Sequence, residues 1–400
     1  MVKVAVMGYG TIGSGVVEIL EQNGARIKMT SGEELEVKYV LDLREFEGDP
    51  IQSRIVHDYQ IIAEDPEVRV VVETMGGVEP AYTFVKAMLA AGKHVTTSNK
   101  ALVADKGAEL IALAREKNVT FLFEASVGGG IPIIRPLISS LTGDEIVEIS
   151  GIVNGTTNYM LTKMTQEELP FDEVLKEAQA KGYAEKDPTA DVEGYDACRK
   201  IAILTSLVCA RQVNYGDIYT EGITKITPVD IMYAKEMGRT IKLLAISRQT
   251  ENGYLAMVAP FLIPVSHPLY NVNDVFNAIF VRGNMLGDAM FYGSGAGKLP
   301  TASAVVGDIV DMVKHMHTNI ILNWDEKPME LADYRDNETR FFVRTRASKA
   351  EITDTFGIVE FVDIEELNDE IGFVTLTMRE RDYEEKAAKL SSILQMIRFH

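Results

Sequence analysis

Short apolar runs alternate with amphipathic stretches through the first 130 residues. The apolar runs predict buried strands at residues 2–8, 37–43, 68–77, 94–99 and 119–127. Apolar positions three or four residues apart predict helices at residues 11–24, 80–93 and 101–118. Strands and helices in this alternation predict an α/β fold with a parallel, doubly wound sheet that is covered on both faces.

The pattern changes after residue 130. Alternating apolar and polar positions predict strands at residues 145–155 and 253–265, and amphipathic stretches predict helices at residues 171–182 and 228–247. These elements indicate an α+β domain with one mostly open sheet. A glycine-rich turn then leads into a further helix at residues 293–316.

The segment from about residue 330 to residue 400 has a pattern of its own. It predicts a strand at residues 340–347, an acidic strand pair at 357–367 and 372–380, and a helix at 383–396. We therefore expect three domains in this chain. They are residues 1–130, with the helix at 301–325 packing back on them, residues 131–300, and residues 330–400.

The composition narrows the class of protein. The 400 residues are 46% apolar and 25% charged, as in soluble globular proteins of two or three domains. The net charge of −19 argues against nucleic acid as a partner, because phosphate binding needs clustered cations. No apolar run approaches the ~18 residues of a membrane span, and the N-terminus lacks the layout of a signal peptide. We expect a cytoplasmic protein without a membrane partner, in which Cys198 and Cys209 are reduced thiols.

A glycine-rich turn, GYGTIG at residues 8–13, joins the first predicted strand to the first predicted helix. Its glycines let the backbone turn tightly and approach a pyrophosphate, which the N-terminus of the helix then attracts. Such a pattern is weak alone, but the flanking strand and helix strengthen it. We therefore predict a Rossmann-type domain that binds NAD or NADP through Gly8, Gly10, Thr11, Ile12 and Gly13.

Further polar residues follow the next strands, at the sheet edge where doubly wound folds bind ligands. Asp42 could accept hydrogen bonds from the ribose hydroxyls of NAD, whereas Arg44 could meet the 2′-phosphate of NADP or be a plain surface arginine. Lys100 could reach the nicotinamide or a substrate oxygen, or could simply begin a helix in solvent. The other candidates at these strand ends are Thr74, Gly76 and Ser98.

Residues 178–200 combine five carboxylates with a lysine. The carboxylates belong to Glu185, Asp187, Asp191, Glu193 and Asp196. Asp196 and Lys200 share one face of the apolar helix that follows. A lysine beside acids can donate a proton to a developing alkoxide, and the acids could hold a substrate ammonium. The competing interpretation is an exposed ion pair worth roughly a few tenths of a kcal/mol.

This segment resembles the signature of the homoserine dehydrogenase family. The matching positions are Ala178, Gly182, Tyr183, Ala184, Asp187, Pro188, Asp191, Val192, Gly194, Asp196 and Lys200. Similar segments lie at residues 8–13, 92–104, 124–134, 151–161 and 295–311, so that the resemblance covers roughly residues 1–325. It implies reversible interconversion of L-homoserine and L-aspartate 4-semialdehyde with NAD or NADP, in threonine, methionine and isoleucine biosynthesis. The competing hypotheses are a related oxidoreductase on another amino-acid-derived carbonyl and a non-catalytic NAD(P) sensor.

The resemblance also implies roles for individual residues. Lys200 is the implied proton donor, Asp196 orients it, and Lys100 is an alternative acid–base group. Glu185 is implied to hold the substrate ammonium, and the remaining substrate-binding residues are Tyr183, Asp191, Gly155 and Thr156. Gly295 joins the cofactor-binding residues. The backbone carbonyls of Glu124, Val127, Gly129 and Ile131 match a monovalent cation site, of the sodium type, although a plain glycine-rich loop would look the same.

Two features depart from the family pattern. Leu41 stands where many members have an arginine, which leaves the choice between NAD and NADP open. Residues 330–400 resemble the βαββαβ regulatory (ACT) domain of longer members, but residues 348–357 lack a full helix pattern. A site for an amino-acid effector such as L-threonine and a dimer-stabilising appendage are therefore both open. No kinase-like region precedes residue 1, so we expect the form that is not fused to aspartate kinase. The resemblance further implies a homodimer or dimer-based oligomer, assembled through residues 131–300.

Overall fold

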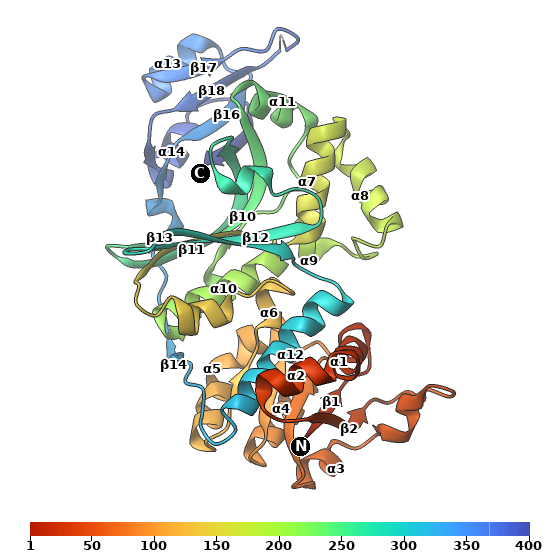
Figure 1. Ribbon diagram of the computed structural model, residues 1–400. Helices are drawn as coiled ribbons and strands as arrows, with labels where there is room; N and C mark the ends of the chain where they lie inside the picture. The colour runs from red at the N-terminus through yellow and green to blue at the C-terminus, as the bar shows by residue number, and fades with distance from the viewer. Residues whose placement is uncertain (368) are drawn as a thin grey trace. The chain divides into compact units, whose positions relative to one another are not determined.

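A computed structural model of the chain describes residues 1–367 and 369–400. The described residues divide into two units (Figure 1). The first unit consists of Met1–Glu145, Ala202–Gly216 and Phe291–Met329. The second unit consists of Ile146–Ile201, Asp217–Met290 and Glu330–His400. No helix among the described residues is both long enough and apolar enough to cross a membrane.

The first unit contains a parallel sheet of six strands in the order β3-β2-β1-β4-β5-β6. Its strands are β1 (Val2–Met7), β2 (Leu35–Leu41), β3 (Ile55–Val56), β4 (Val68–Glu73), β5 (His94–Thr97) and β6 (Phe121–Leu122). The four residues at 4–7 in β1 have no exposed surface, which explains why their apolar run shows no alternation. The strand order is that of a doubly wound dinucleotide-binding sheet, so the predicted fold class is confirmed.

Seven helices accompany this sheet among the described residues of the first unit. They are α1 (Thr11–Gln22), α2 (Gly24–Ser31), α3 (Tyr59–Glu64), α4 (Ala81–Ala90), α5 (Lys100–Glu116), α6 (Ala125–Gly128) and α12 (Lys298–Lys314). Shorter elements are the 3-10 helix Pro50–Arg54, the π-helix Pro136–Ser140 and the strand pair β8 (Arg211–Gln212) and β14 (Asp325–Pro328).

Helix α12 packs against α1 (Figure 1). A Cβ atom on Gly15 would lie 3.0 Å from the Cβ of Ala302, so the absence of a side chain at Gly15 lets the two helices approach. The helix ends at Lys314 rather than near residue 325. The strand predicted at 119–127 is also shorter, because β6 covers only two residues and α6 begins at Ala125.

The second unit contains most of a mixed sheet of ten strands. Its order is β13-β12-β7-β10-β11-β20-β16-β18-β17, with β9 also paired to β11. The strands are β7 (Ile146–Ile152), β9 (Tyr219–Thr220), β10 (Arg239–Thr250), β11 (Gly253–Pro264), β12 (Phe276–Gly283), β13 (Gly287–Ser294), β16 (Phe341–Thr345), β17 (Val359–Val362), β18 (Ile371–Thr375) and β20 (Ile393–Phe399). One apolar cluster on this sheet joins Ile152, Leu244, Met257, Phe261 and Phe280.

The helices of the second unit lie between these strands in the sequence. They are α7 (Gly155–Glu167), α8 (Phe171–Ala180), α9 (Thr189–Val192), α10 (Tyr195–Cys209, which continues into the first unit), α11 (Pro228–Glu236), α13 (Lys349–Phe356) and α14 (Glu380–Ala387). Smaller elements are the 3-10 turns Tyr215–Asp217, Pro268–Asn271 and Tyr334–Asp336 and the strand pair β15 (Glu338–Thr339) and β19 (Met378–Arg379).

Two predicted helices are wrong over part of their length. The helix predicted at 228–247 ends at Glu236, the chain turns at Gly238 with φ +62°, and β10 follows. Because residues 240–247 are buried, their apolar run carries no strand alternation and was compatible with a helix. The helix predicted at 383–396 ends at Ala387, and β20 begins at Ile393.

Residues from β16 to β20 form the expected βαββαβ order. The segment at 348–357 is helical after all, since α13 begins with a capping box between Ser348 and Glu351. The serine hydroxyl accepts from the Glu351 N–H at 3.3 Å, and the Glu351 carboxylate accepts from the Ser348 N–H at 2.8 Å. Strand β20 also pairs with β11 in parallel, so the C-terminal strands continue the larger sheet.

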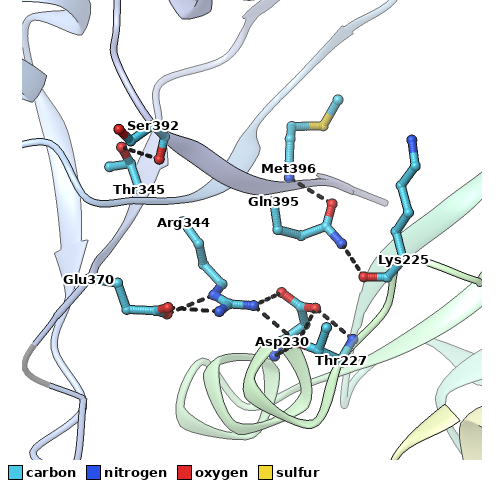
Figure 2. A network of polar contacts seen from close by, with 9 residues as sticks. All are labelled: Lys225, Thr227, Asp230, Arg344, Thr345, Glu370, Ser392, Gln395 and Met396. Carbon is cyan, nitrogen blue, oxygen red and sulfur yellow. Dashed lines mark hydrogen bonds and ion pairs between the residues drawn. The ribbon is translucent and has the colours of Figure 1, made fainter.

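A buried arginine adds a second attachment of the C-terminal strands to the rest of the unit (Figure 2). Arg344 in β16 donates to Asp230 at 2.6 Å and to Thr227 at 3.2 Å, both at the start of α11. The same guanidinium binds Glu370 through two bonds of 2.7 and 2.8 Å. Asp230 has no exposed surface, so this ion pair is made away from water.

Candidate active site

The glycine turn between β1 and α1 has a different role at each glycine. Gly8 has φ +97°, which favours glycine, and a Cβ on Gly13 would overlap the carbonyl oxygen of Gly8. A Cβ on Gly10 would meet no atom within 4 Å. There is therefore no room for a side chain at Gly13, whereas the space next to Gly10 is empty. Helix α1 begins at Thr11, and no side chain caps its N-terminus. This geometry fits a pyrophosphate at the helix N-terminus, and Ile12 lies in the same first turn.

Asp42 and Arg44 form one ion pair rather than two separate ligand groups. The Asp42 carboxylate accepts from the Tyr9 N–H at 2.8 Å and from two guanidinium nitrogens of Arg44 at 2.8 and 2.9 Å. These bonds from Arg44 hold the pKa of Asp42 well below its usual range. The Arg44 side chain is 59% exposed, whereas that of Asp42 is 8% exposed. A cation therefore faces solvent where β2 ends.

The loop after β4 is fixed by the buried carboxylate of Glu73. Glu73 accepts from the N–H groups of Met75 at 2.6 Å and Gly76 at 3.3 Å. Burial raises the pKa of Glu73. Thr74 donates from its hydroxyl to the carbonyl of Gly8 at 2.9 Å, which links this loop to the glycine turn. Two of the predicted cofactor residues, Thr74 and Gly76, thus lie in one pre-formed loop.

Ser98 and Lys100 lie at the end of β5 and the beginning of α5. The Ser98 N–H donates to the carbonyl of Glu73 at 3.3 Å, which places Ser98 beside the previous strand end. Asn99 caps the helix through a bond from the Leu102 N–H of 3.1 Å. Lys100 is the first residue of α5 and is half-buried. The structure therefore brings the predicted cofactor residues of this edge together within the first unit.

The carboxylate of Glu124 binds the backbone of residues 133–135. Its two oxygens accept from three consecutive backbone N–H groups, of Ile133 and Arg135 at 2.6 Å and of Ile134 at 2.9 Å. Glu124 is 2% exposed. A cation at this place would therefore meet the backbone carbonyl of Glu124, because the carboxylate is already used.

The other predicted cation residues lie in the same turn. Val127 belongs to α6, and the Ile131 N–H donates to the carbonyl of Gly128 at 2.9 Å. Gly129 has φ +57°, and a Cβ there would overlap the carbonyl of Gly295. This part of the turn thus contacts the segment that contains Gly295. Carbonyl oxygens suit a hard monovalent ion, so the donor chemistry fits.

Lys200 and Asp196 form a buried pair on α10. The Lys200 Nζ atom donates to the carbonyl of Val153 at 2.6 Å and lies 2.8 Å from the Asp196 carboxylate. Lys200 is 8% exposed and Asp196 is 5% exposed. The competing interpretation of Lys200 and Asp196 as an exposed ion pair is therefore wrong.

Asn154 connects this pair to the start of α7. Its amide nitrogen donates to Asp191 at 2.7 Å and to Asp196 at 2.9 Å. Its side-chain oxygen caps α7 by accepting from the Thr157 N–H at 2.9 Å. An asparagine directly before a helical run is a common N-cap.

The remaining substrate candidates surround the same helix start. The Thr156 hydroxyl donates to the carbonyl of Tyr183 at 2.6 Å, so the two predicted residues are in contact. Gly155 begins α7. Glu185 lies in an exposed stretch two residues after Tyr183, and its backbone carbonyl accepts from Gln179 at 3.0 Å. Lys200, Asp196, Asp191, Thr156 and Tyr183 are therefore linked through residues 153–156 of the second unit.

A doubly wound domain with a glycine-rich dinucleotide turn, together with a buried lysine–aspartate pair, defines an NAD(P)-dependent dehydrogenase. Two family models match the chain, the homoserine dehydrogenase NAD binding domain over residues 8–124 and homoserine dehydrogenase over residues 132–310. The chain belongs to the homoserine dehydrogenase family.

Relatives and solved structures agree with this assignment. The homoserine dehydrogenase of Bacillus subtilis is 44% identical over 325 residues, which cover 80% of this chain and 75% of that protein. The enzyme of Corynebacterium glutamicum is 39% identical over 400 residues, 96% of this chain and 87% of that protein. A crystal structure of a homoserine dehydrogenase from Thiobacillus denitrificans superposes with a TM-score of 0.93 at 35% identity, covering 100% of this chain and 98% of that chain.

A hyperthermophilic archaeal homoserine dehydrogenase in complex with NADPH is also similar. It has a TM-score of 0.68 and 29% identity, covering 80% of this chain and 99% of that chain.

Proposed function

We propose that this protein interconverts L-homoserine and L-aspartate 4-semialdehyde, with Lys200 as the group that moves the proton. The supporting observation is the buried Lys200–Asp196 pair beside Val153 and Asn154. A lysine ammonium has three N–H donors. Two of them are directed at Val153 and Asp196, so the third is available for a substrate oxygen.

When bound, a nicotinamide would accept a hydride from carbon 4 of the substrate or return it there. In the oxidation, Lys200 in its neutral form takes the proton from the C4 hydroxyl, and the oxygen that remains becomes the aldehyde oxygen. In the reduction, the Lys200 ammonium returns that proton to the alkoxide. Asp196 fixes the direction of the Lys200 side chain through its contact of 2.8 Å. The substrate ammonium is assigned to Glu185, with Tyr183 and Asp191 close by.

The experiment follows NADH or NADPH formation from L-homoserine at alkaline pH. Lys200→Met should lower kcat by at least about 100-fold while the Kd for the dinucleotide stays within about two-fold. Lys176→Met, which changes an exposed lysine on α8, is the matched control and should retain wild-type rates. If Lys100→Met abolished turnover and Lys200→Met did not, the proton role would belong to Lys100. Wild-type protein without turnover on either cofactor would refute the function.

The choice of cofactor is assigned to the pair of Asp42 and Arg44. An exposed guanidinium where β2 ends favours a 2′-phosphate, whereas the carboxylate favours a free ribose 2′-hydroxyl. Arg44→Ala should therefore raise the KM for NADP⁺ and leave that for NAD⁺ nearly unchanged. Equal changes for both cofactors would contradict this assignment.

A sodium-type cation is assigned to the backbone carbonyls of Glu124, Val127, Gly129 and Ile131. Thermal unfolding and activity in sodium chloride and in choline chloride test it. An ion bound to the native state raises the midpoint of unfolding, so equal midpoints in the two salts would contradict the site.

Residues 330–400 are the candidate regulatory region, and residues 131–300 are the candidate substrate-binding and dimerisation region. Their roles are tested by kinetics with and without L-threonine, and by light scattering on the purified protein. A homodimer in the cytoplasm is the expected state. A monomer at micromolar concentration, or insensitivity to L-threonine, would remove the corresponding role.

A further inference from the structure

Glu73 is a fully buried carboxylate whose hydrogen bonds come from the ligand-binding edge of the parallel sheet. It ends β4 and has no exposed surface. Its Oε1 atom accepts from the N–H groups of Met75 at 2.6 Å and Gly76 at 3.3 Å. Its Oε2 atom accepts from the hydroxyl of Thr97 at the end of β5. Burial of a carboxylate is costly without such donors, so its role is expected in the loops that it binds and not in the apolar core.

Thr97 and Asn99 extend these bonds to the start of α5. The Thr97 hydroxyl accepts from the Asn99 N–H at 2.9 Å. The Asn99 side-chain oxygen caps α5 by accepting from the Leu102 N–H at 3.1 Å, and its amide nitrogen donates to the carbonyl of Gly77. Because Gly77 lies in the loop after β4, which the carboxylate also binds, these bonds close into a ring. The loop after β4 and the start of α5 are therefore joined as one hydrogen-bonded structure.

This ring determines the position of two predicted site segments. Lys100 is the first residue of α5 and directly follows Asn99, so the ring fixes the backbone from which the lysine side chain extends. On the other side, Thr74 in the loop after β4 donates from its hydroxyl to the carbonyl of Gly8 in the glycine turn at 2.9 Å. A displacement of the Glu73 carboxylate would therefore reach both the lysine and the loop beside the glycine turn.

The place of the ring in the strand order favours one half of a dinucleotide. In doubly wound sheets the pyrophosphate binds at the turn after β1, and an acidic residue after β2, here Asp42, receives the adenosine ribose. Strands β2 and β4 lie on opposite sides of β1. The ends of β4 and β5, which the ring joins, are therefore left for the nicotinamide half.

We propose that Glu73 is a positioning residue that holds the loop after β4 and the start of α5, with Lys100, in the arrangement that receives the nicotinamide half of the cofactor. Glu73 acts through the hydrogen bonds that its side chain makes with Thr97 and with the loop, and it touches no reacting atom. This inference rests on the proposed function, because it concerns the cofactor side of the same dehydrogenase site.

Substitutions at Glu73 test the role by cofactor binding, which needs no turnover. The ligands are ADP, which has only the adenosine half, and whichever of NADH and NADPH binds the wild type more tightly. Glu73→Leu removes both acceptor oxygens and should raise the Kd of the reduced dinucleotide at least about 10-fold in a fluorescence titration, while calorimetry gives a Kd for ADP within about two-fold of the wild type. Glu73→Gln retains an oxygen for the two N–H groups and places an amide donor at Thr97. It should bind the reduced dinucleotide within about three-fold of the wild type.

Thr97→Val removes only the bond that leads from Glu73 to α5. It should lower kcat about 10-fold or more and leave the Kd of the reduced dinucleotide nearly unchanged, because the loop after β4 keeps its bonds while the start of α5 is displaced.

Thr96→Val is the matched control. Thr96 precedes Thr97 in β5, and its hydroxyl donates to the buried carboxylate of Asp308 at 2.9 Å. Consecutive strand residues point to opposite faces of the sheet, so this bond lies away from the ring. Thr96→Val should lower the midpoint of thermal unfolding about as much as Thr97→Val does, with kcat and the dinucleotide Kd at their wild-type values.

Equal losses of kcat in the two valine variants would make Glu73 a merely structural residue and overturn the proposal. Binding by Glu73→Gln that is as weak as binding by Glu73→Leu would assign the effect to the charge and overturn it as well. The valine pair and Glu73→Gln decide the question even if Glu73→Leu does not fold. Absence of turnover in the wild type would instead refute the proposed function, and the titrations with the reduced dinucleotide and ADP would still decide the role of Glu73.

Discussion

Asn154 performs two tasks that substitutions can separate. Its oxygen caps α7 through Thr157, and its amide nitrogen donates to Asp191 and Asp196. Loss of an N-cap costs about 1 kcal/mol of stability, and each hydrogen bond to a carboxylate is worth about 1.5–3 kcal/mol. The cap acts on folding, whereas the bond to Asp196 acts on the orientation of Lys200.

Asn154→Ser retains a capping oxygen and removes both amide bonds. We expect a fall in kcat/KM of about 10- to 100-fold, which corresponds to the loss of one such bond in the transition state, and a loss of stability from the two missing amide bonds. Asn154→Ala should show the same fall in kcat/KM and, in addition, a decrease of the unfolding midpoint by about 2–4 °C. Steady-state kinetics and thermal unfolding of the same preparations measure the two effects.

The control for cap loss alone is Ser348→Ala at the start of α13, where the serine belongs to a capping box. It should lower the unfolding midpoint and leave kcat/KM unchanged. If Asn154→Ser retained more than half of the wild-type kcat/KM, the orienting role of Asn154 would be refuted. If Asn154→Ala lost activity only in proportion to its unfolded fraction, the effect would be one of folding.

Two further substitutions test the frame around the site. Gly13→Ala would place a Cβ on the Gly8 carbonyl, so α1 must move by about 1 Å. The affinity for NADPH should therefore fall at least about 10-fold. A fluorescence titration with NADPH that gives the wild-type affinity would contradict this. Arg344→Met leaves the fully buried Asp230 without its cation and should lower the free energy of unfolding by about 3–5 kcal/mol in urea. Lys349→Met breaks an exposed ion pair in the same C-terminal segment and should lower it by less than about 1 kcal/mol, and equal losses for the two variants would refute the argument.

Elements whose chemistry is local were predicted well from the sequence. The strand, glycine turn and helix at residues 2–24 were found because valines, glycines and a helical period follow one another directly. The strand β10 was not found, because its buried run of TIKLLAIS has the apolar content of either a helix or a central strand. Only its pairing with β11 and β7 decides between them, and that pairing is a tertiary property.

The candidate site also contains a part that local sequence predicts and a part that it does not. The spacing of Asp196 and Lys200 placed them on one helical face, and the structure confirms their contact. The contacts of Asn154 with Asp191 and Asp196 could not be predicted, because these residues come from a segment far away in the chain. Asp196 lies 42 residues beyond Asn154.

The place of β20 has a consequence for biosynthesis of the chain. This strand lies between β11 and β16, yet it follows every other strand of the ten-stranded sheet in the sequence. On the ribosome, β16, β17 and β18 can pair with one another as soon as they emerge, but they cannot reach β11 until residues 393–399 have also been made. Until then β11 lacks its partner strand at Phe261 and Leu262, so this part of its edge stays open while the rest of the chain is made.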